Sequence, residues 1–588
     1  MRKILAVSFW LLAISSMSAQ TLNVQVGNVH YLFPAAQTSA MPYDNGSTLT
    51  VMGKVFNLSE IDSMWVDETA VTDNTVGVVY EGSAAAMTVA GNIAKDLTIA
   101  STGAHVSIVQ SADVAEEITY TLSGSSTDGG FYNEGAYKST VELDNLTLTN
   151  VSATYSGAAI HIQNSKRIKI KPLNGTENTL VDAASGNQKG CLYVKGHIEF
   201  AQKGTLNITG NVKHGIKSGE YFQIKNSTIN ILSCVGDGIN CGEYFQMESG
   251  SITATTSSGC EWDSTKKKVK GVACISSDGN IEISGGTLNL TSTGAGGKGI
   301  SGDSAFVVSG NADITIATSG QAVVASSTGS LSVVSNSRTL DNYTSDYKCS
   351  PKGIKIDGDI VINGGTITVT TSGAGGEGIE SKSTLTINGG HITVNAYDDG
   401  INSSGDMTIN GGYIFAKGAN NDAMDANGNM YIKGGLIYAI GAGGAEKSLD
   451  ANTEGGYKLY VQGGTIIAVG DLESGASISG GTAKYASSWS ASTWYALYNG
   501  SDLVAAFMTP TQTTSSGGGG GWGGPGGGGP GASSTQKLIV YTSSTPSLKS
   551  GVTVTDGTEY FSGMANIGGT VSGGSNVTLS NYTSSGGW

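Results

Sequence analysis

Residues 361–369 read VINGGTITV, and close copies follow at residues 386–394 (TINGGHITV), 408–416 (TINGGYIFA) and 431–439 (YIKGGLIYA). The paired glycines begin at positions 364, 389, 411, 434 and 463, so successive copies lie 25, 22, 23 and 29 residues apart. A repeat of this length, built from two short apolar runs, is typical of a solenoid.

Each copy has the pattern of a strand, a sharp corner and a second strand. Ile362, Ile367 and Val369 alternate with polar residues, which is the period of a strand with one buried face. The Asn-Gly-Gly step between the runs tolerates positive φ, and a third short run, such as residues 378–380, closes the coil. Because one coil cannot bury its apolar side alone, the coils must stack. The sequence therefore predicts an all-β chain whose main part is a right-handed, single-stranded parallel β-helix.

The extent of the repeat divides the chain into segments. An open end of a β-helix exposes unpaired strand edges, so we expect small β-rich modules to cap both ends. The predicted segments are a signal peptide at 1–19, an N-terminal module at 20–116, the β-helix at 117–480, and a C-terminal module at 481–588 with a Gly-rich loop at 517–531.

The N-terminus and the charge of the chain restrict where it acts and what it binds. Arg2 and Lys3 precede an apolar run and small residues that end at Ala19, so we expect export to the periplasm, the cell surface or the medium. No later apolar run is long enough to span a membrane. The formal net charge of −15 disfavours nucleic acid as a partner, because such partners need a basic face.

Six cysteines are present, and none of their spacings is a CxxC metal pair. Cys241 and Cys274 occupy similar places in adjacent repeats, so disulfide bridging is one interpretation. The alternative is that they are small buried thiols in the interior.

Part of the chain resembles a known family, the secreted bacterial carbohydrate-binding proteins with a pectate-lyase-like parallel β-helix. The residues that carry the resemblance are 157–168 (GAAIHIQNSKRI), 174–182 (NGTENTLVD), 215–218 (GIKS) and 237–240 (DGIN). The resemblance covers roughly residues 117–480. It implies binding of a plant-type polysaccharide such as cellulose or pectin, with calcium, and a relationship to lyases without established catalysis.

Aligning the repeats on their Gly-Ile step places acidic side chains in two columns. Stacked carboxylates on neighbouring coils repel one another, which favours raised pKa values or a bridging cation. Oxygen ligands of this kind suit Ca²⁺, and the alternative is a row of solvated corner residues. The best predicted calcium cluster consists of Glu380, Asp398, Asp399, Asp422 and Asp425.

Aromatic side chains form a second candidate site. Strand alternation places Tyr221 outside, with Tyr244 beside it one coil later, and the same logic predicts an outward pair of Phe415 and Tyr438. Aromatic faces on a flat sheet hold sugar rings. The alternative is cross-strand aromatic pairing that only stabilises the ladder.

The sequence gives little support for catalysis. A calcium-dependent lyase needs a basic side chain beside the ion, and only Lys355 and Lys217 fall in a suitable column, several coils from the densest carboxylates. The six histidines form no HExxH motif, and the chain has no GxSxG motif. We therefore expect a non-catalytic, calcium-assisted protein that binds plant-type or acidic polysaccharide. The alternatives are a pectate-type lyase and a structural or adhesive surface protein.

Overall fold

The computed structural model describes residues 20–44, 46–511 and 536–584. The predicted signal peptide and the predicted Gly-rich loop lie outside the described residues. The prediction of an all-β chain is confirmed, because strands account for nearly all regular structure. The helices are short 3₁₀ turns: η1 (Ala35–Gln37), η2 (Ala94–Asp96), η3 (Thr154–Gly157), η4 (Ser337–Asn342), η5 (Ser345–Tyr347) and η6 (Thr453–Gly455). Among the described residues, no helix has the length and apolarity needed to cross a membrane.

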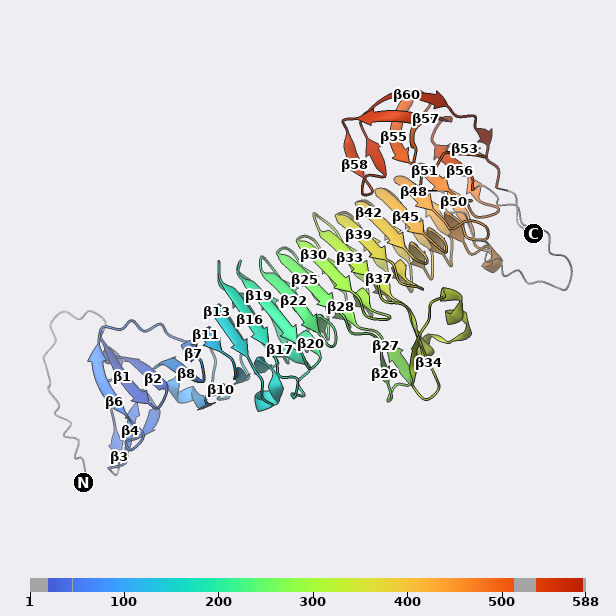
Figure 1. Cartoon of the computed structure of the whole chain (residues 1–588). Coiled ribbons are helices and arrows are strands. Elements are labelled where there is room, and N and C mark those ends of the chain that lie inside the picture. Colours follow the sequence, from blue (N-terminus) through green and yellow to red (C-terminus); the bar gives the residue numbers. More distant parts are fainter. Residues whose placement is uncertain (1–19, 45, 512–535, 585–588) are drawn as a thin grey trace.

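Three ladders of parallel strands form an elongated body, and each repeat contributes one strand to each ladder (Figure 1). The first ladder belongs to a sheet of 14 strands, which we call the 14-stranded sheet: β9 (Leu97–Thr102), β10 (Ala104–Gln110), β12 (Gly129–Glu134), β14 (Ile160–Gln163), β17 (Gly190–Val194), β20 (His214–Ser218), β23 (Ile239–Cys241), β28 (Ala273–Ser277), β31 (Lys298–Gly302), β37 (Lys352–Ile356), β40 (Glu377–Ser381), β43 (Ile401–Ser403), β46 (Met424–Ala426) and β49 (Leu449–Ala451).

The other two ladders belong to one larger sheet. The second ladder contains β11 (Ile118–Ser126), β13 (Ser139–Thr149), β15 (Arg167–Pro172), β18 (His197–Phe200), β21 (Phe222–Ile224), β24 (Phe245–Met247), β29 (Ile281–Ile283), β32 (Phe306–Val308), β38 (Ile360–Ile362), β41 (Leu385–Ile387), β44 (Met407–Ile409), β47 (Met430–Ile432), β50 (Leu459–Val461) and β52 (Ser477–Ile478). The third contains β16 (Glu177–Val181), β19 (Thr205–Gly210), β22 (Thr228–Cys234), β25 (Ser251–Thr256), β30 (Thr287–Ser292), β33 (Asp313–Thr318), β39 (Thr366–Thr371), β42 (His391–Ala396), β45 (Tyr413–Gly418), β48 (Leu436–Ile440) and β51 (Thr465–Val469).

Isoleucines stack in register inside the ladders. Ile354, Ile379 and Ile401 pair in sequence along the 14-stranded sheet, and each is fully buried. The glycine pairs make the corners, as expected: the second glycine of the pair at 389–390 has φ +96°, and a Cβ there would lie 2.9 Å from the carbonyl oxygen of Gly365. The repeat therefore encodes both the buried face and the turn that stacks one coil on the next.

The N-terminal module continues into the ladders without a break. Parallel pairing already joins its strands to the ladders before residue 117, because β7 pairs with β11 and β10 pairs with β12. Its strands are β1 (Thr21–Val26), β2 (Val29–Pro34), β3 (Tyr43–Asp44), β4 (Thr48–Val51), β5 (Lys54–Asn57), β6 (Ser63–Asp67), β7 (Thr75–Glu81) and β8 (Ala84–Ala90).

The C-terminal module packs on the last coils, and Figure 1 shows it above β48 and β51. Its strand β56 pairs antiparallel with β51, and a sheet of six strands lies beyond it. The strands are β53 (Thr482–Ala486), β54 (Trp494–Asn499), β55 (Asp502–Met508), β56 (Leu538–Thr542), β57 (Pro546–Thr555), β58 (Thr558–Tyr560), β59 (Ala565–Ile567), β60 (Thr570–Asn576) and β61 (Ser580–Asn581).

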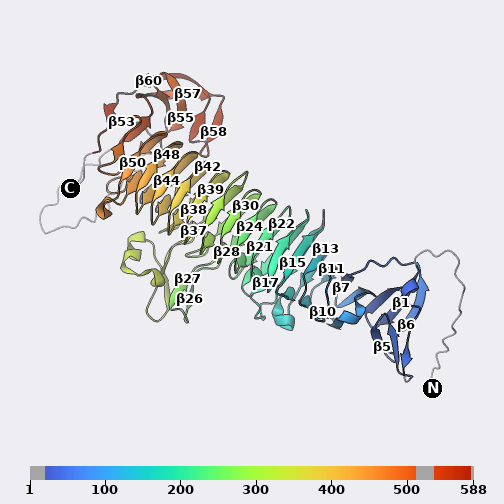
Figure 2. The same ribbon diagram turned by 180° about the vertical axis from the view of Figure 1, so that it is seen from behind.

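Two insertions interrupt the ladders and project together from the side of the 14-stranded sheet (Figures 1 and 2). The first insertion, residues 257–272, carries the hairpin of β26 (Glu261–Asp263) and β27 (Lys268–Lys270). The second, residues 319–351, carries the small sheet of β34 (Val323–Ala325), β35 (Leu331–Val333) and β36 (Lys348–Cys349).

The predicted stacking of Cys241 on Cys274 is wrong. In the pairing of β23 with β28, Cys241 lies opposite Ser277, and Ile275 lies opposite Ile239. Both cysteines are free and buried, in agreement with the alternative interpretation.

Candidate functional site

A groove of about 900 Å³ lies between the 14-stranded sheet and the two insertions. The walls include residues of β27 and β36. The floor is one column of the sheet, in which each residue pairs with the next: Asn240, Ser276, Ser301, Lys355 and Glu380. Every side chain of this floor is polar, so the floor offers hydrogen bonds and charge to whatever enters the groove.

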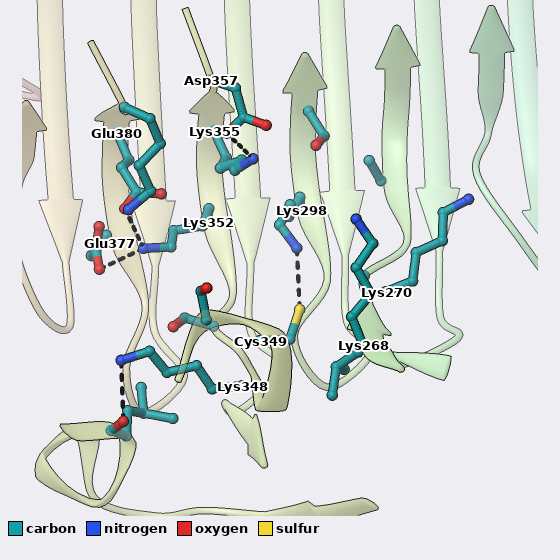
Figure 3. A pocket seen from close by; sticks show the side chains of 18 of the residues that line it. Lys268, Lys270, Lys298, Lys348, Cys349, Lys352, Lys355, Asp357, Glu377 and Glu380 are labelled. Carbon is teal, nitrogen blue, oxygen red and sulfur yellow. Dashed lines mark hydrogen bonds and ion pairs between the residues drawn. The ribbon is translucent and has the colours of Figure 1, made fainter. Parts of the chain in front are cut away.

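Lys352 lies buried at one end of the groove, between two glutamates (Figure 3). Its Nζ lies 2.5 Å from Glu377 Oε1 and 3.2 Å from Glu380 Oε1. Burial opposes the charge of Lys352, but the two carboxylates outweigh burial and raise its pKa. The Lys352 ammonium is therefore committed to its neighbours and stays protonated.

Lys268 and Lys270 line the other end of the groove from β27 and are both exposed. Among the described residues, neither ammonium group has an ion-pair partner. The two lysines singled out by sequence are engaged instead: Lys355 pairs with Asp357, and Lys217 donates to Asn240 Oδ1 at 2.5 Å. The free positive charge of the groove thus comes from the insertion.

Three carboxylates come together on the coils that follow the groove. Asp422, Asp425 and Asp450 each offer one oxygen, and these atoms all lie within 4.8 Å of one another. Burial is the main cause that raises the pKa of Asp422 to about 7 and that of Asp425 to about 6. Burial and a hydrogen bond with Glu473 raise the pKa of Asp450 to about 10. Among the described residues none of the three carboxylates has an ion-pair partner, although the charge of Lys447 acts on Asp422. Desolvated oxygen donors of this kind fit a hard divalent cation such as Ca²⁺.

The predicted calcium cluster is only partly assembled. Asp422 and Asp425 lie together, and Asn402 Nδ2 bridges from Asp399 Oδ2 (3.0 Å) to Asp425 Oδ2 (3.2 Å). The third carboxylate is Asp450, which belongs to the same column but was not in the predicted cluster.

Glu380 and Asp398, also in the predicted cluster, lie outside this group of three carboxylates. Burial opposes ionisation of Glu380, but Lys352 and Lys382 outweigh it and lower the pKa of Glu380 to about 2. Lys352 and Lys382 therefore neutralise this carboxylate in the structure. Asp398 accepts a hydrogen bond from Asn421 and is not one of the three grouped carboxylates.

Tyr221 and Tyr244 face outward, as the alternation predicts, but they stack on each other. Their ring centroids are 4.8 Å apart at an interplanar angle of 11°, and His197 stacks on the other side of Tyr221 at 4.2 Å. Both faces of the Tyr221 ring are therefore covered. Tyr244 is 38% exposed and ends the stack, so its outer face is the one that remains for a sugar ring.

Phe415 and Tyr438 point outward, as predicted, but the prediction that this pair can hold a sugar ring is wrong. Phe415 is 3% exposed and Tyr438 is fully buried. Both point away from the interior of the coils, but the C-terminal module covers them: Tyr438 packs against Phe507 and donates its hydroxyl to the carbonyl of Met508 at 2.7 Å.

A different outward tyrosine pair was missed. Tyr431 and Tyr460 stack on β47 and β50 with ring centroids 5.1 Å apart, and Lys433 Nζ lies 5.3 Å from the Tyr431 ring. The sequence contains a signal for this pair. Each tyrosine directly precedes an aliphatic residue, and a Gly-Gly corner begins two positions after that residue.

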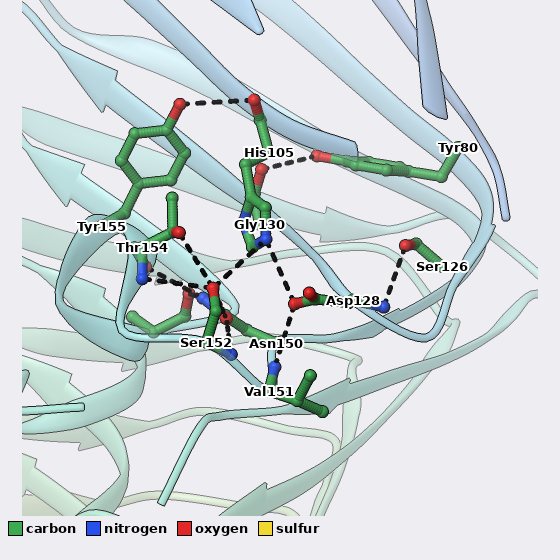
Figure 4. A network of polar contacts seen from close by, with 11 residues as sticks. Tyr80, His105, Ser126, Asp128, Gly130, Asn150, Val151, Ser152, Thr154 and Tyr155 are labelled. Atoms are coloured by element: carbon green, nitrogen blue, oxygen red, sulfur yellow. Dashed lines mark hydrogen bonds and ion pairs between the residues drawn. The ribbon is translucent and has the colours of Figure 1, made fainter. Parts of the chain in front are cut away.

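A network near the start of the ladders brings His105, Asp128 and Ser152 together (Figure 4). His105 Nε2 lies 3.1 Å from Asp128 Oδ1 and 3.3 Å from Ser152 Oγ. A catalytic triad needs the carboxylate and the serine on different ring nitrogens. Here both partners contact the same nitrogen, so the network joins loops and does not activate Ser152.

Comparisons with known proteins complete the description of the site. The search of curated proteins gives no match. One solved structure, described as the polysaccharide lyase-like protein from C. thermocellum in a gadolinium derivative, is 18% identical, with a TM-score of 0.31. The match covers 42% of this chain and 91% of that one. A family model described as "Carbohydrate-binding domain-containing protein" matches residues 102–396 and 370–423, together more than half of the 588 residues. The chain belongs to this family of carbohydrate-binding domain-containing proteins.

Proposed function

We propose that this protein binds an acidic polysaccharide non-catalytically in the groove over the 14-stranded sheet. The observation that carries the proposal is the groove itself, whose polar floor follows several successive strands at a spacing of about 4.8 Å. An extended polymer with regularly spaced hydroxyl groups matches a floor of this kind. The family of the chain supports carbohydrate as the class of ligand.

The sign of the ligand charge follows from the unpaired lysines. Lys268 and Lys270 stand at one end of the groove without ion-pair partners among the described residues, although Asp278 and Asp303 also line that part. At the other end Glu377 and Glu380 are paired with Lys352. A uronate carboxylate would pair with Lys268 or Lys270, and the neutral part of the chain would lie over Ser276 and Ser301.

The proposal includes a calcium site on the coils that follow the groove. Asp422, Asp425 and Asp450 would hold the ion, which would replace the protons that these buried carboxylates otherwise retain. Asn402 hydrogen-bonds both Asp425 and Asp399, and Asp399 lines the groove. The Asn402 amide therefore links the protonation state of the three carboxylates to Asp399 in the groove.

Two further parts of the proposal concern architecture and location. We infer that the coils wind as a right-handed parallel β-helix, because three parallel strands per repeat and the strong preference for right-handed crossovers both favour it. The cationic start and apolar run of residues 1–19 support export.

The engaged lysines support a binding role over a lyase. Proton abstraction beside a uronate requires a neutral or readily neutralised base. Lys352 is kept protonated by Glu377 and Glu380, and Lys355 is paired with Asp357. Incubation with polygalacturonate should therefore produce no absorbance from unsaturated uronates, and such absorbance that disappears in Lys355→Ala would establish the lyase instead.

The test is retention of the full chain on a panel of insoluble neutral and acidic polysaccharides, with Ca²⁺ or EGTA. We expect retention on acidic polymers, about thirtyfold weaker in Lys268→Ala/Lys270→Ala, since each of the two charged contacts contributes about 1 kcal/mol. The matched control is Lys166→Ala/Lys458→Ala, which removes two exposed lysines outside the groove. Equal retention of both double variants would contradict the groove assignment, and no retention on any polymer would favour the structural or adhesive alternative.

A further inference from the structure

The two insertions that wall the groove meet at a pair of cysteines that are 89 positions apart in the sequence, Cys260 and Cys349. Cys260 precedes β26 in the first insertion, and Cys349 ends β36 in the second. Both join one small apolar cluster with Val269 and Ala325, which also come from the two insertions. This cluster is the point where the insertions pack on each other.

The two sulfur atoms share one space beside Gly296. A Cβ placed on Gly296 would lie 2.1 Å from Cys260 Sγ and 3.0 Å from Cys349 Sγ. The glycine thus leaves the room that the two thiols occupy. The structure holds both as free thiols, with Cys349 buried and Cys260 partly exposed.

A lysine stands beside the buried thiol. Lys298 Nζ lies 3.2 Å from Cys349 Sγ and 3.3 Å from the carbonyl oxygen of Gly296 (Figure 3). A hydrogen bond from Cys260 and the charge of Lys298 outweigh burial and lower the pKa of Cys349 to about 5, whereas the pKa of Cys260 is raised. The Lys298 ammonium therefore favours the thiolate form of Cys349 over that of Cys260.

We propose that Cys260 and Cys349 are a redox pair that forms a disulfide between the two insertions and so fixes the wall of the groove. The other cysteines lack this arrangement: Cys241, for example, lies opposite Ser277. The proposal concerns the groove wall and does not depend on which polysaccharide the groove binds.

The oxidant is a disulfide carrier, either a small-molecule disulfide or a protein disulfide. The partly exposed Cys260, after loss of its proton to water, attacks one sulfur of the carrier and releases the first carrier thiolate. The Cys349 thiolate then attacks Cys260 Sγ in the mixed disulfide and releases the second carrier thiolate. The two protein sulfurs lose two electrons in total, and the carrier disulfide is reduced to two thiols.

A cross-link at this point has a direct structural consequence. The β26–β27 hairpin carries Lys268 and Lys270, and its strand β27 contacts β36 of the second insertion directly. In the reduced protein the insertions are joined by the apolar cluster and by side-chain contacts such as that of the tilted Trp262 and Tyr347 rings, whose centroids are 5.5 Å apart. The disulfide would convert that contact into a covalent joint.

The experiment equilibrates the full chain with oxidised or reduced glutathione, quenches with acid, and counts thiols by alkylation in denaturant with mass spectrometry. We expect two fewer labels in the oxidised sample, and a Cys260–Cys349 cross-linked peptide in a non-reducing digest. Cys260→Ser and Cys349→Ser should each abolish this cross-link, whereas Cys234→Ser should retain it.

The count of alkylated thiols in the wild-type protein tests the proposed disulfide even if a cysteine variant fails to fold. Equal label counts in the two samples, or a cross-link between any other pair of cysteines, would overturn the proposal. As a second readout, hydrogen exchange in residues 260–270 should slow at least severalfold on oxidation, and unchanged exchange would refute the fixed wall.

Discussion

Two pairs of aromatic residues point outward from different ladders and have opposite surroundings. Tyr221 and Tyr244 immediately precede β21 and β24 of the second ladder and reach solvent, with Tyr244 38% exposed. Phe415 and Tyr438, on β45 and β48, are buried beneath the C-terminal module. The period of a strand thus assigns a side chain to the inside or outside of a coil, but it does not say what covers the outside.

The sequences of the strands contain the missing signal. In β48 (LIYAI) every residue is apolar, and Leu436, Tyr438 and Ile440 face the module while Ile437 and Ala439 face the interior. In β42 (HITVNA), by contrast, the outward residues are polar. A strand buried on both faces reads as a continuous apolar run, so the loss of alternation at β48 predicts a covered face.

The largest change in local stability is expected when the side chain of Tyr438, beneath the C-terminal module, is truncated. Tyr438→Ala should lower the free energy of opening of β48 by about 3–5 kcal/mol, because it leaves a cavity and an unpaired Met508 carbonyl. Hydrogen exchange of the β48 and β51 amides measures this local stability without assuming that the whole chain unfolds in one step.

Two matched variants sharpen the comparison. Tyr438→Phe keeps the packing and loses one hydrogen bond, for an expected cost of about 1 kcal/mol. Tyr221→Ala should cost about 1 kcal/mol at β21, since it removes stacking at a partly exposed site. An equal effect of Tyr221→Ala and Tyr438→Ala would show that the C-terminal module does not cover the ladder.

The second test uses the acidic cluster of Asp422, Asp425 and Asp450, in the last coils of the ladders. The folded pKa values of Asp422 and Asp425, about 7 and about 6, lie above the ordinary value near 3.9, so the folded state binds these protons more tightly. Their stabilising contribution is therefore complete below pH 4 and is lost as the pH rises through 6 and 7. Without divalent cations we expect the coils around β46 to lose roughly 2–3 kcal/mol between pH 4 and pH 7.5.

The measurement is hydrogen exchange at β46 over this pH range, corrected for the intrinsic exchange rate. Asp425→Asn should flatten the pH dependence, and millimolar Ca²⁺ should restore the stability of the wild type at pH 7.5 but not that of the variant. The coils around β21 serve as an internal reference. If Ca²⁺ stabilised both regions equally, the three carboxylates would not be its site.

The comparison also shows how far sequence reasoning reaches. The repeat alone predicted the all-β class, the Gly-Gly corners and the column in which Asp425 pairs with Asp450, because these features depend only on period. The groove depends on contacts between segments without a repeat. The position of Lys268 and the pairing of Lys352 with Glu377 follow from how two insertions fold back on the ladder, and no local pattern encodes that distance.

The smallest expected effect belongs to the exposed pair. Tyr244→Ala should weaken retention on acidic polysaccharide about fivefold, which corresponds to about 1 kcal/mol, if the open face of this ring contacts sugar. Tyr221→Ala in the same assay should have a smaller effect, because His197 and Tyr244 cover both faces of its ring.

Tyr431→Ala is the matched control, since it removes a stacked outward tyrosine of another part of the second ladder. The measurement is a binding isotherm on one insoluble polymer at fixed salt. Equal losses in all three variants would mean that stacking stabilises the ladder and that none of the rings recognises sugar, whereas a loss confined to Tyr244→Ala would show that an uncovered ring face, and not the aromatic column as such, makes the upstream region a contact surface.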